Sequence, residues 1–382
     1  MTETGGLFGS ILNSLTFPLA FVFVLSIVVF FHELGHFLVA RWCGVTVKTF
    51  SIGFGREIWG FNDRHGTRWR LAWIPLGGYV KFLDDEGVAS TPSRSALDKM
   101  SSNDRQGAFH LKPVWQRAAV VAAGPFANFL LAIVIFSVIF ALFGVSRLEP
   151  RVGNVVAGSP AEAAGVKSGD LVVKIRGEEI DDFGDLQRIV STSPEQDLEF
   201  VLDRAGKLVT TTIRPRLTEH DDMISGRVKT PIIGITNAPG AERSHRTVGV
   251  GEAVALGVER TSNIITGTFA FIVDLIRGRQ SADQLGGPIR IADVSGQVAK
   301  FGIQPLLQLV AVISVSVGLI NLFPIPLLDG GHLLYYAIEA VRRRPLSERS
   351  QEIGFRIGLA IVLMLMVFAT LNDLPILKKW FF

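Results

Sequence analysis

The sequence predicts a polytopic α-helical membrane protein with about four transmembrane helices, a membrane-associated β-hairpin or small sheet, and an inserted α+β domain. The chain has 382 residues, of which 48% are hydrophobic and 19% charged, and its mean hydropathy is +0.37. It is too apolar for an ordinary soluble protein and too charged for a bundle of membrane helices alone. Four apolar runs approach or exceed the ~20 residues that cross a bilayer. They occupy about 10–38, 118–146, 301–337 and 355–372.

The distribution of Lys and Arg predicts the orientation of these spans. Residues 1–16 contain neither, whereas 39–117 and the arginine triplet at 342–344 are basic, and basic segments tend to stay in the cytoplasm. We therefore expect the N-terminus, residues 147–300 and the C-terminus on the outer side. The net charge of +3 gives no indication of nucleic-acid binding. The single cysteine, Cys43, excludes an internal disulfide and a cysteine-based zinc cluster.

The stretch His32-Glu33-Leu34-Gly35-His36 ends the first apolar run. Residues four apart share one helix face, so His32 and His36 can present two imidazoles to one ion, and Glu33 can reach a water bound to it. This spacing is typical of zinc hydrolases. The alternative is a buried structural cluster. However, an ionisable side chain at membrane depth costs about 2.5–3.5 kcal/mol on insertion scales and marks a functional site by default.

Residues 41–117 are predicted to lie in the cytoplasm or to dip into the membrane. The segment 68–82 alternates polar and apolar residues and contains Gly77-Gly78, which we interpret as the turn of a β-hairpin. Such a hairpin either is a plain surface element or offers a sheet edge that pairs with an extended substrate. Residues 84–112 are predicted to form a polar loop, and we expect His65 and His110 to be solvated.

The second span contains the stretch Ala123-Gly124-Pro125-Phe126-Ala127-Asn128. Small residues allow helices to approach closely. This stretch therefore either packs against the first span or contacts the reacting centre directly.

The region 150–237 is soluble in character and predicts a small α+β domain. Short strands are expected near 152–156, 170–175, 198–202 and 209–213, with helices starting at Ser159 and Asp182. The run 158–180 resembles a bacterial PDZ domain. That resemblance implies a groove between a strand and a helix, which either binds a peptide or leaves the domain to block access by its bulk.

Residues 248–300 are predicted to be a linker region without a span, although 262–275 is apolar. An extra span there would place Asp329 at the membrane face opposite His32 and His36. We therefore expect 248–277 to form an amphipathic or interfacial helix.

The third span ends in Asn321-Leu-Phe-Pro324-Ile-Pro326-Leu-Leu-Asp329-Gly-Gly-His332. The two prolines break the helix, and irregular backbone at membrane depth is tolerated only where it is buried in protein or lines a wet cavity. Asp329 lies in this break. It can complete a two-histidine, one-carboxylate zinc site, with His332 as an alternative ligand, or it simply caps a helix.

Asn321 also allows two interpretations. Its amide can donate a hydrogen bond to the substrate backbone or to a developing oxyanion. Alternatively, it bonds to a neighbouring helix.

With these motifs in place, the chain resembles the site-2 protease family of intramembrane zinc metalloproteases. The matching pieces are His-Glu-Leu-Gly-His at 32–36, Gly-Phe-Gly at 53–55, the stretch 321–331 and the PDZ-like domain. It is most similar to the regulator-of-sigma-E protease branch. The best-known members of that branch carry two tandem PDZ domains, whereas this sequence carries one.

The resemblance implies a multi-pass enzyme of the bacterial inner membrane, with lipid around it, one Zn²⁺ per chain and an active site towards the cytoplasm. Its membrane domain would consist of two halves, 1–146 and 301–382. The implied substrates are single-span membrane proteins already shortened on the outer side, such as anti-sigma factors and remnant signal peptides. The resemblance assigns substrate binding to Asn321, Gly53, Gly55, Pro324 and Pro326.

The predicted reaction is hydrolysis of a peptide bond within a membrane span. His32, His36 and Asp329 would hold zinc, while Glu33 accepts a proton from the attacking water and delivers it to the leaving amine. A PDZ-bearing scaffold with a structural metal is an alternative, but a structural site needs only ligands and leaves Glu33 unexplained. Paired broken helices from an internal repeat would favour a metal-dependent transporter, and the sequence shows no such repeat.

Overall fold

The computed structural model describes residues 4–84, 100–222, 226–237, 243–278, 282 and 285–381. The chain divides into two units, which are described separately. The membrane unit consists of Met1–Ser137, Val254–Ala270 and Gly286–Phe382. The inserted unit consists of Val138–Ala253 and Phe271–Leu285.

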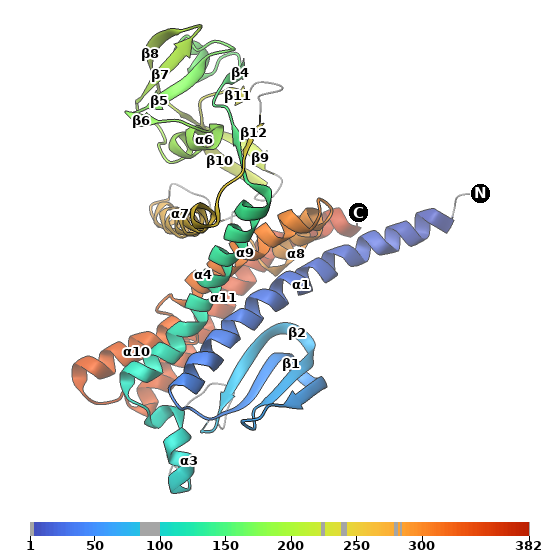
Figure 1. Ribbon diagram of the computed structural model, residues 1–382, viewed down its shortest axis with the longest axis vertical. Coiled ribbons are helices and arrows are strands. Elements are labelled where there is room, and N and C mark those ends of the chain that lie inside the picture. Colours follow the sequence, from blue (N-terminus) through green and yellow to red (C-terminus); the bar gives the residue numbers. More distant parts are fainter. Residues whose placement is uncertain are drawn as a thin grey trace. The chain divides into compact units, whose positions relative to one another are not determined.

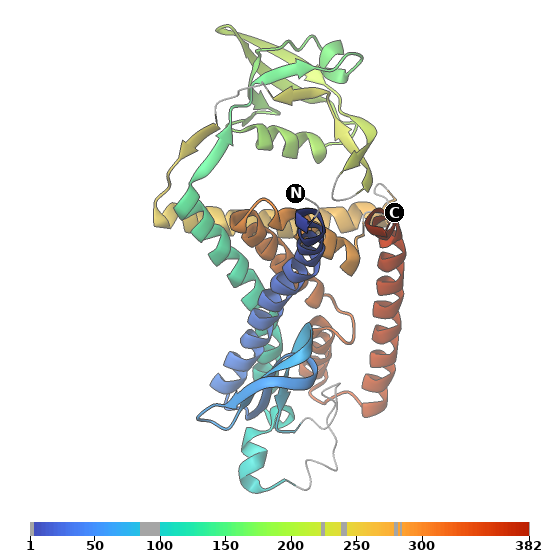
Figure 2. The same ribbon diagram turned by 90° about the vertical axis from the view of Figure 1, so that its right-hand side faces the viewer.

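Four helices of the described residues are long and apolar enough to cross a membrane, which confirms the predicted number. They are Thr16–Trp42 within α1 (Thr4–Trp42), α4 (Val114–Phe143), α9 (Ile303–Asn321) and Arg349–Ile376 within α11 (Glu348–Phe381). Figures 1 and 2 show α1 in blue and α11 in red. The helix α7 (Val250–Ile276) is continuous and is not among the four; its position at the membrane interface stays a prediction.

The predicted third span, 301–337, is wrong in its extent because it consists of two helices. The first, α9, ends at Asn321, and the second, α10, runs over Asp329–Arg342. Pro324 and Pro326 lie between them, and proline removes a helix donor and clashes with the preceding turn. Leu327 has a φ of +108°, which a non-glycine residue rarely adopts. The segment between the helices thus turns sharply just before Asp329.

The β-structure is a small sheet built from two long bent strands, β1 (Val47–Asn62) and β2 (Arg68–Phe82), which pair antiparallel. Thr49 pairs with both Arg68 and Lys81, and Phe50 with both Trp69 and Val80. The start of β1 therefore has a partner on each side. The end of β2, Gly78–Phe82, pairs only with β1 among the described residues, so it forms an edge.

The chain turns close to the predicted Gly77-Gly78, because residues 49–52 pair with 68–71 in the same direction and with 78–81 in the opposite direction. It also reverses at 63–67, where the Asp63 carboxylate accepts hydrogen bonds from the N–H groups of His65 (2.8 Å) and Thr67 (2.9 Å). Side chains of Asp commonly stabilise turns in this way. After this turn, Gly78 lies in β2 against α1, because a Cβ there would be 2.9 Å from Val29 Cγ1 and 3.0 Å from Glu33 Cγ.

The polar segment that follows the sheet is more ordered than the sequence suggests. Residues 85–99 lie outside the described part, but α3 (Ser102–Gly107) and a 3-10 turn, η1 (Phe109–Leu111), precede α4. The buried Asp84 accepts hydrogen bonds from the N–H of Phe109 (2.9 Å) and from His110 Nδ1 (2.7 Å). The prediction of a solvated His110 is therefore wrong. Burial alone would raise the pKa of Asp84, but the hydrogen bonds from His110 hold that pKa below its usual value.

Helix α8 (Pro288–Ala299) packs against both α1 and α11. The fully buried Asp373 of α11 accepts hydrogen bonds from the N–H groups of Gly287 and Arg290, both at 2.9 Å. These are first-turn N–H groups that have no partner inside the helix. Asp373 therefore fastens the start of α8 to the last span.

The inserted unit is an α+β structure built around a four-stranded sheet in the order β6-β5-β7-β8. The pairs β4–β11, β3–β12 and β9–β10 complete its strands. Its core consists of buried aliphatic side chains and Phe200. The elements are β3 (Val145–Leu148), β4 (Val152–Val155), α5 (Pro160–Ala163), β5 (Leu171–Ile175), β6 (Glu178–Glu179), α6 (Phe183–Ser191), β7 (Leu198–Arg204), β8 (Lys207–Ile213), β9 (Arg216–Asp222), β10 (Gly226–Ile232), β11 (Ile235–Asn237) and β12 (Arg243–Arg246).

One ion pair inside this unit makes its stability depend on pH. Asp170 is 1% exposed and accepts hydrogen bonds from Arg204 Nε (2.8 Å) and Nη2 (2.7 Å). These bonds hold the pKa of the Asp170 carboxyl below its usual value. The stabilisation is complete above the unfolded-state pKa of about 3.9 and is lost as the pH falls through the lower folded-state pKa.

We expect Asp170→Asn to lower the free energy of unfolding of this unit by about 2 kcal/mol at pH 7. The difference from the wild type should shrink below about pH 4. Hydrogen exchange of the β5 and β7 amides in the whole chain, corrected for intrinsic rates, measures both. Glu179→Gln is the control, because Glu179 forms an exposed 3.4 Å pair with Lys174 and such pairs contribute little. A pH-independent difference would contradict the assignment.

Candidate metal centre

The buried stripe of α1 leads directly to the two histidines. Ala20, Val24 and Val28 are at most 6% exposed and pack in one core cluster with Leu306 and Val310 of α9. These α1 positions are four residues apart, so the same face continues to His32 and His36. The helix therefore turns both imidazoles towards the protein, with ring centroids 4.8 Å apart and planes at 88°.

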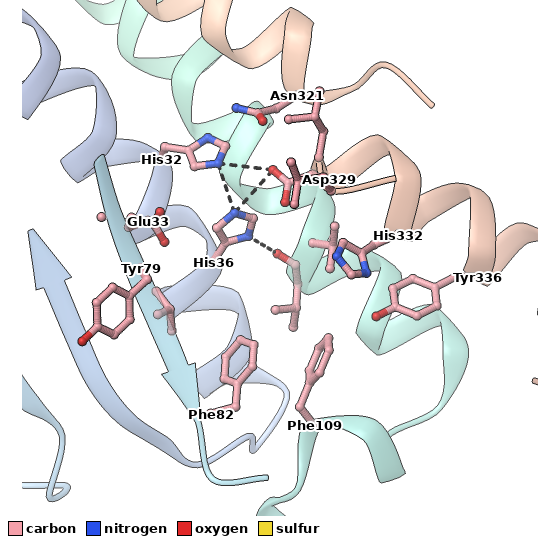
Figure 3. A pocket seen from close by; sticks show the side chains of 16 residues that line it. His32, Glu33, His36, Tyr79, Phe82, Phe109, Asn321, Asp329, His332 and Tyr336 are labelled. Carbon is pink, nitrogen blue, oxygen red and sulfur yellow. Dashed lines mark hydrogen bonds and ion pairs between the residues drawn. The ribbon is translucent and has the colours of Figure 1, made fainter. Parts of the chain in front are cut away.

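Asp329, at the start of α10, meets this histidine pair. His32 Nε2 lies 3.3 Å from His36 Nε2, and Asp329 Oδ2 lies 3.2 Å from the first and 3.5 Å from the second. Figure 3 shows the three side chains pointing towards one another. Apart from the two imidazoles, the buried Oδ2 has no partner among the described residues.

These three atoms fit a zinc ion. Zinc bonds of about 2.0–2.1 Å in a tetrahedron place neighbouring ligand atoms about 3.3 Å apart, which matches all three separations. Two imidazoles and one carboxylate are also a standard catalytic donor set that leaves a position open for water. The described residues bring these three together as one possible metal group, and His332 is not part of it.

Helix α4 closes the other side of the pair. His36 Nδ1–H donates to the Val120 carbonyl at 2.9 Å, which leaves Nε2 free to bind a metal. A Cβ on Gly124 would collide with the His36 ring and lie 2.9 Å from His32 Cε1. Asn128 reaches His32 Nδ1 at 3.2 Å. The stretch 123–128 thus packs against α1 at the histidines themselves, so both interpretations of it hold.

The three groups open into a cleft of about 280 Å³ within the membrane unit. Glu33 lines it on the side of the sheet edge, next to Gly78 and Tyr79 (Figure 3). The remaining lining comes from β2, η1, α4, the end of α9, the break before α10 and α10 itself. The polar side chains along the cleft are His32, Glu33, His36, Tyr79, Asn321, Asp329, His332 and Tyr336.

The five predicted substrate-binding residues do not all lie at the cleft. Asn321 lines the cleft, whereas Gly53, Gly55, Pro324 and Pro326 do not. Gly53 has a φ of +85°, and a Cβ there would come within 2.6 Å of the Ile74 carbonyl, so its role in the described structure is to bend β1. Pro326 packs against Gly354 and Gly358 of α11.

Two residues of the site were not singled out from the sequence. Gly78 was interpreted as a turn, and only the three-dimensional contact with Glu33 shows its place. Asn128 carried a usable signal, since it is an uncharged polar residue inside an apolar span and lies one helical turn after Gly124.

Together, the apolar helices and this cluster define a multi-pass membrane metalloprotease. Residues 20–365 match the sequence family described as Peptidase family M50, and the chain therefore belongs to peptidase family M50, the site-2 protease family. It is a zinc metalloprotease, as its relatives' names also indicate.

Three relatives illustrate the similarity. A protein of Mesorhizobium japonicum, named as a zinc metalloprotease, is 50% identical over 357 residues, covering 93% of this chain and 97% of the relative. A protein of Agrobacterium fabrum with the same type of name is 48% identical over 375 residues, covering 98% of each chain. Metalloprotease MmpA of Caulobacter vibrioides is 43% identical over 377 residues, covering 92% of this chain and 94% of the relative.

Proposed function

We propose that this protein hydrolyses peptide bonds within the transmembrane segments of single-span membrane proteins. The observation that carries the proposal is the position of the metal-binding group. His32, Glu33 and His36 lie inside the apolar helix Thr16–Trp42, and Asp329 joins them from the break after another apolar helix. A hydrolytic site built there favours substrates that are themselves in the membrane.

His32, His36 and Asp329 would hold one zinc ion per chain. When bound, zinc polarises the scissile carbonyl and makes a water available as a nucleophile near pH 7. Glu33 accepts a proton from the attacking water and delivers it to the nitrogen of the leaving amine. Asn321, across the cleft, is positioned to donate a hydrogen bond to the substrate carbonyl as negative charge develops on its oxygen.

The edge of β2 supports a way to hold the substrate. A helical peptide must become extended before its bonds are exposed, and a free strand edge stabilises an extended chain through backbone hydrogen bonds. Gly78–Phe82 has a strand partner on one side only among the described residues, and Gly78, Tyr79, Val80 and Phe82 line the cleft. A substrate paired with this edge would pass Glu33.

The inserted unit supplies the proposed selectivity. Its strands and helices and the resemblance of 158–180 support a single PDZ domain of the regulator-of-sigma-E protease branch. This domain would lie on the outer side of the bacterial inner membrane and admit substrates whose outer part has been shortened. Anti-sigma factors and remnant signal peptides have this form. The active site would then lie towards the cytoplasmic side.

The position of the cut tests the proposal. The whole protein is reconstituted with a single-span test substrate whose outer domain has been removed, and the products are mapped by mass spectrometry. We expect cleavage inside the apolar segment, loss of cleavage with a zinc chelator and recovery on adding Zn²⁺.

A matched substrate with its full outer domain should be cut more slowly, because the inserted unit would exclude it. Cuts confined to the polar flanks of either substrate would contradict intramembrane proteolysis.

A further inference from the structure

Asn128 is a buried polar residue that the proposed mechanism does not use. It lies in α4, is 0% exposed, and its Nδ2 is 3.2 Å from His32 Nδ1. Its Oδ1 is also buried and has no hydrogen-bond partner among the described residues. The contact with His32 is therefore the hydrogen-bond contact that the described residues show for this side chain.

The chemistry of His32 decides which end of the amide faces it. A neutral imidazole carries a proton on one ring nitrogen and a lone pair on the other. His32 Nε2 points to His36 Nε2 and Asp329 Oδ2 and needs its lone pair to bind a metal. The proton must then reside on Nδ1, which faces Asn128 and requires an acceptor there.

The two ends of an Asn amide have the same shape, and the hydrogen-bond network determines which end faces a neighbour. With Nδ2 towards His32, two donors would meet. We infer that Oδ1 of Asn128 accepts the His32 Nδ1–H, with the amide NH₂ in the position of the buried oxygen. Asn128 is thus a positioning residue that fixes the tautomer and ring orientation of His32 for zinc.

This assignment gives both histidines the same type of support from α4. His36 Nδ1–H donates to the Val120 carbonyl, and His32 Nδ1–H donates to a side chain two turns later. Outer contacts of this kind orient metal-binding histidines, and their loss typically reduces metal affinity about 10–100-fold.

The backbone of Asn128 is held independently of its side chain. Ser314 Oγ of α9 donates to the Asn128 carbonyl at 2.9 Å, and a Cβ on Gly318 would be 3.2 Å from Asn128 Cβ. The close approach of α9 therefore fixes this turn of α4. This separation of backbone and side-chain contacts allows a controlled experiment.

The experiment measures zinc affinity of the purified whole protein by chelator competition, for the wild type, Asn128→Leu and Asn128→Asp. Leucine keeps the branching at Cγ but is larger and has no acceptor, whereas aspartate has the size of asparagine and keeps an acceptor oxygen. We expect about 10–100-fold weaker zinc binding for leucine and affinity within a few fold of the wild type for aspartate. Ser314→Ala is the matched control, because it removes the contact with the backbone of Asn128 only, and it should bind zinc like the wild type.

The visible absorption spectrum of bound Co²⁺ gives a second measurement. It reports the arrangement of the atoms that bind the ion, which a change in helix packing alone would leave the same. We expect the leucine variant to change the spectrum and the aspartate and Ser314→Ala variants to keep it. If leucine prevents folding, Asn128→Ala takes its place in both measurements.

The inference is overturned if the leucine or alanine variant binds zinc like the wild type, or if the aspartate variant loses as much affinity as leucine. It rests on the proposed metal site. A wild-type protein that binds no zinc would overturn that site as well, so the two failures are distinguishable.

Discussion

Glu33→Gln should abolish cleavage of the single-span test substrate while leaving zinc bound. Gln has the size of Glu but cannot accept a proton at neutral pH, and a positioned general base contributes about 10²–10⁴-fold to a reaction rate. We therefore expect a fall in kcat of that size in reconstituted membranes. The three proposed zinc ligands are unchanged, so the zinc content should remain that of the wild type.

The site around Glu33 makes this substitution a clean test. The side chain lines the cleft beside Gly78, and a Cβ on Gly78 would be 3.0 Å from Glu33 Cγ, so an isosteric residue is needed to avoid disturbing the sheet edge. Glu352→Gln is the control for removing a glutamate, because Glu352 lies outside the cleft lining and pairs with Arg356 on the exposed side of α11. Unchanged kcat in Glu33→Gln would exclude Glu33 as the base.

The elements with strong local signals could be predicted from the sequence. Apolar length located the four spans, and the His32–His36 spacing located one face of a helix. The prolines at 324 and 326 indicated the break before Asp329. Each of these depends on a few neighbouring residues, which is why periodicity and backbone sterics were sufficient.

What could not be predicted depends on contacts between distant segments. The sequence indicates a turn at Gly77-Gly78, but the pairing of 49–52 with both 68–71 and 78–81 depends on contacts between segments that are not adjacent. His110 looked like a loop residue because its partner, Asp84, is 26 positions away. Similarly, the bond of Asn128 to His32 spans 96 positions, and no local pattern encodes it.

Asp329 lies far from the two histidines in the sequence, so removing it is the most informative test of the predicted zinc ligands. Asp329→Asn should reduce zinc affinity by more than the roughly 10–100-fold that the loss of an outer contact costs, because it removes one of three direct ligands. A neutral amide oxygen has nearly the same position as Oδ2 but lacks the charge that balances the ion. The zinc content after dialysis against a chelator should fall from about one per chain towards zero, and proteolysis should fall with it.

The control for this substitution is Asp293→Asn. Asp293 is a carboxylate of the same unit, lies in α8 and accepts a hydrogen bond from Gln297 Nε2 at 2.7 Å, away from the cleft lining. It should keep both zinc and activity. If Asp329→Asn instead binds zinc as the wild type does, the 3.2 and 3.5 Å contacts with the histidines are an ion pair and not part of a metal site. The third ligand would then have to come from another group in the cleft, with His332, one turn along α10, as the first candidate.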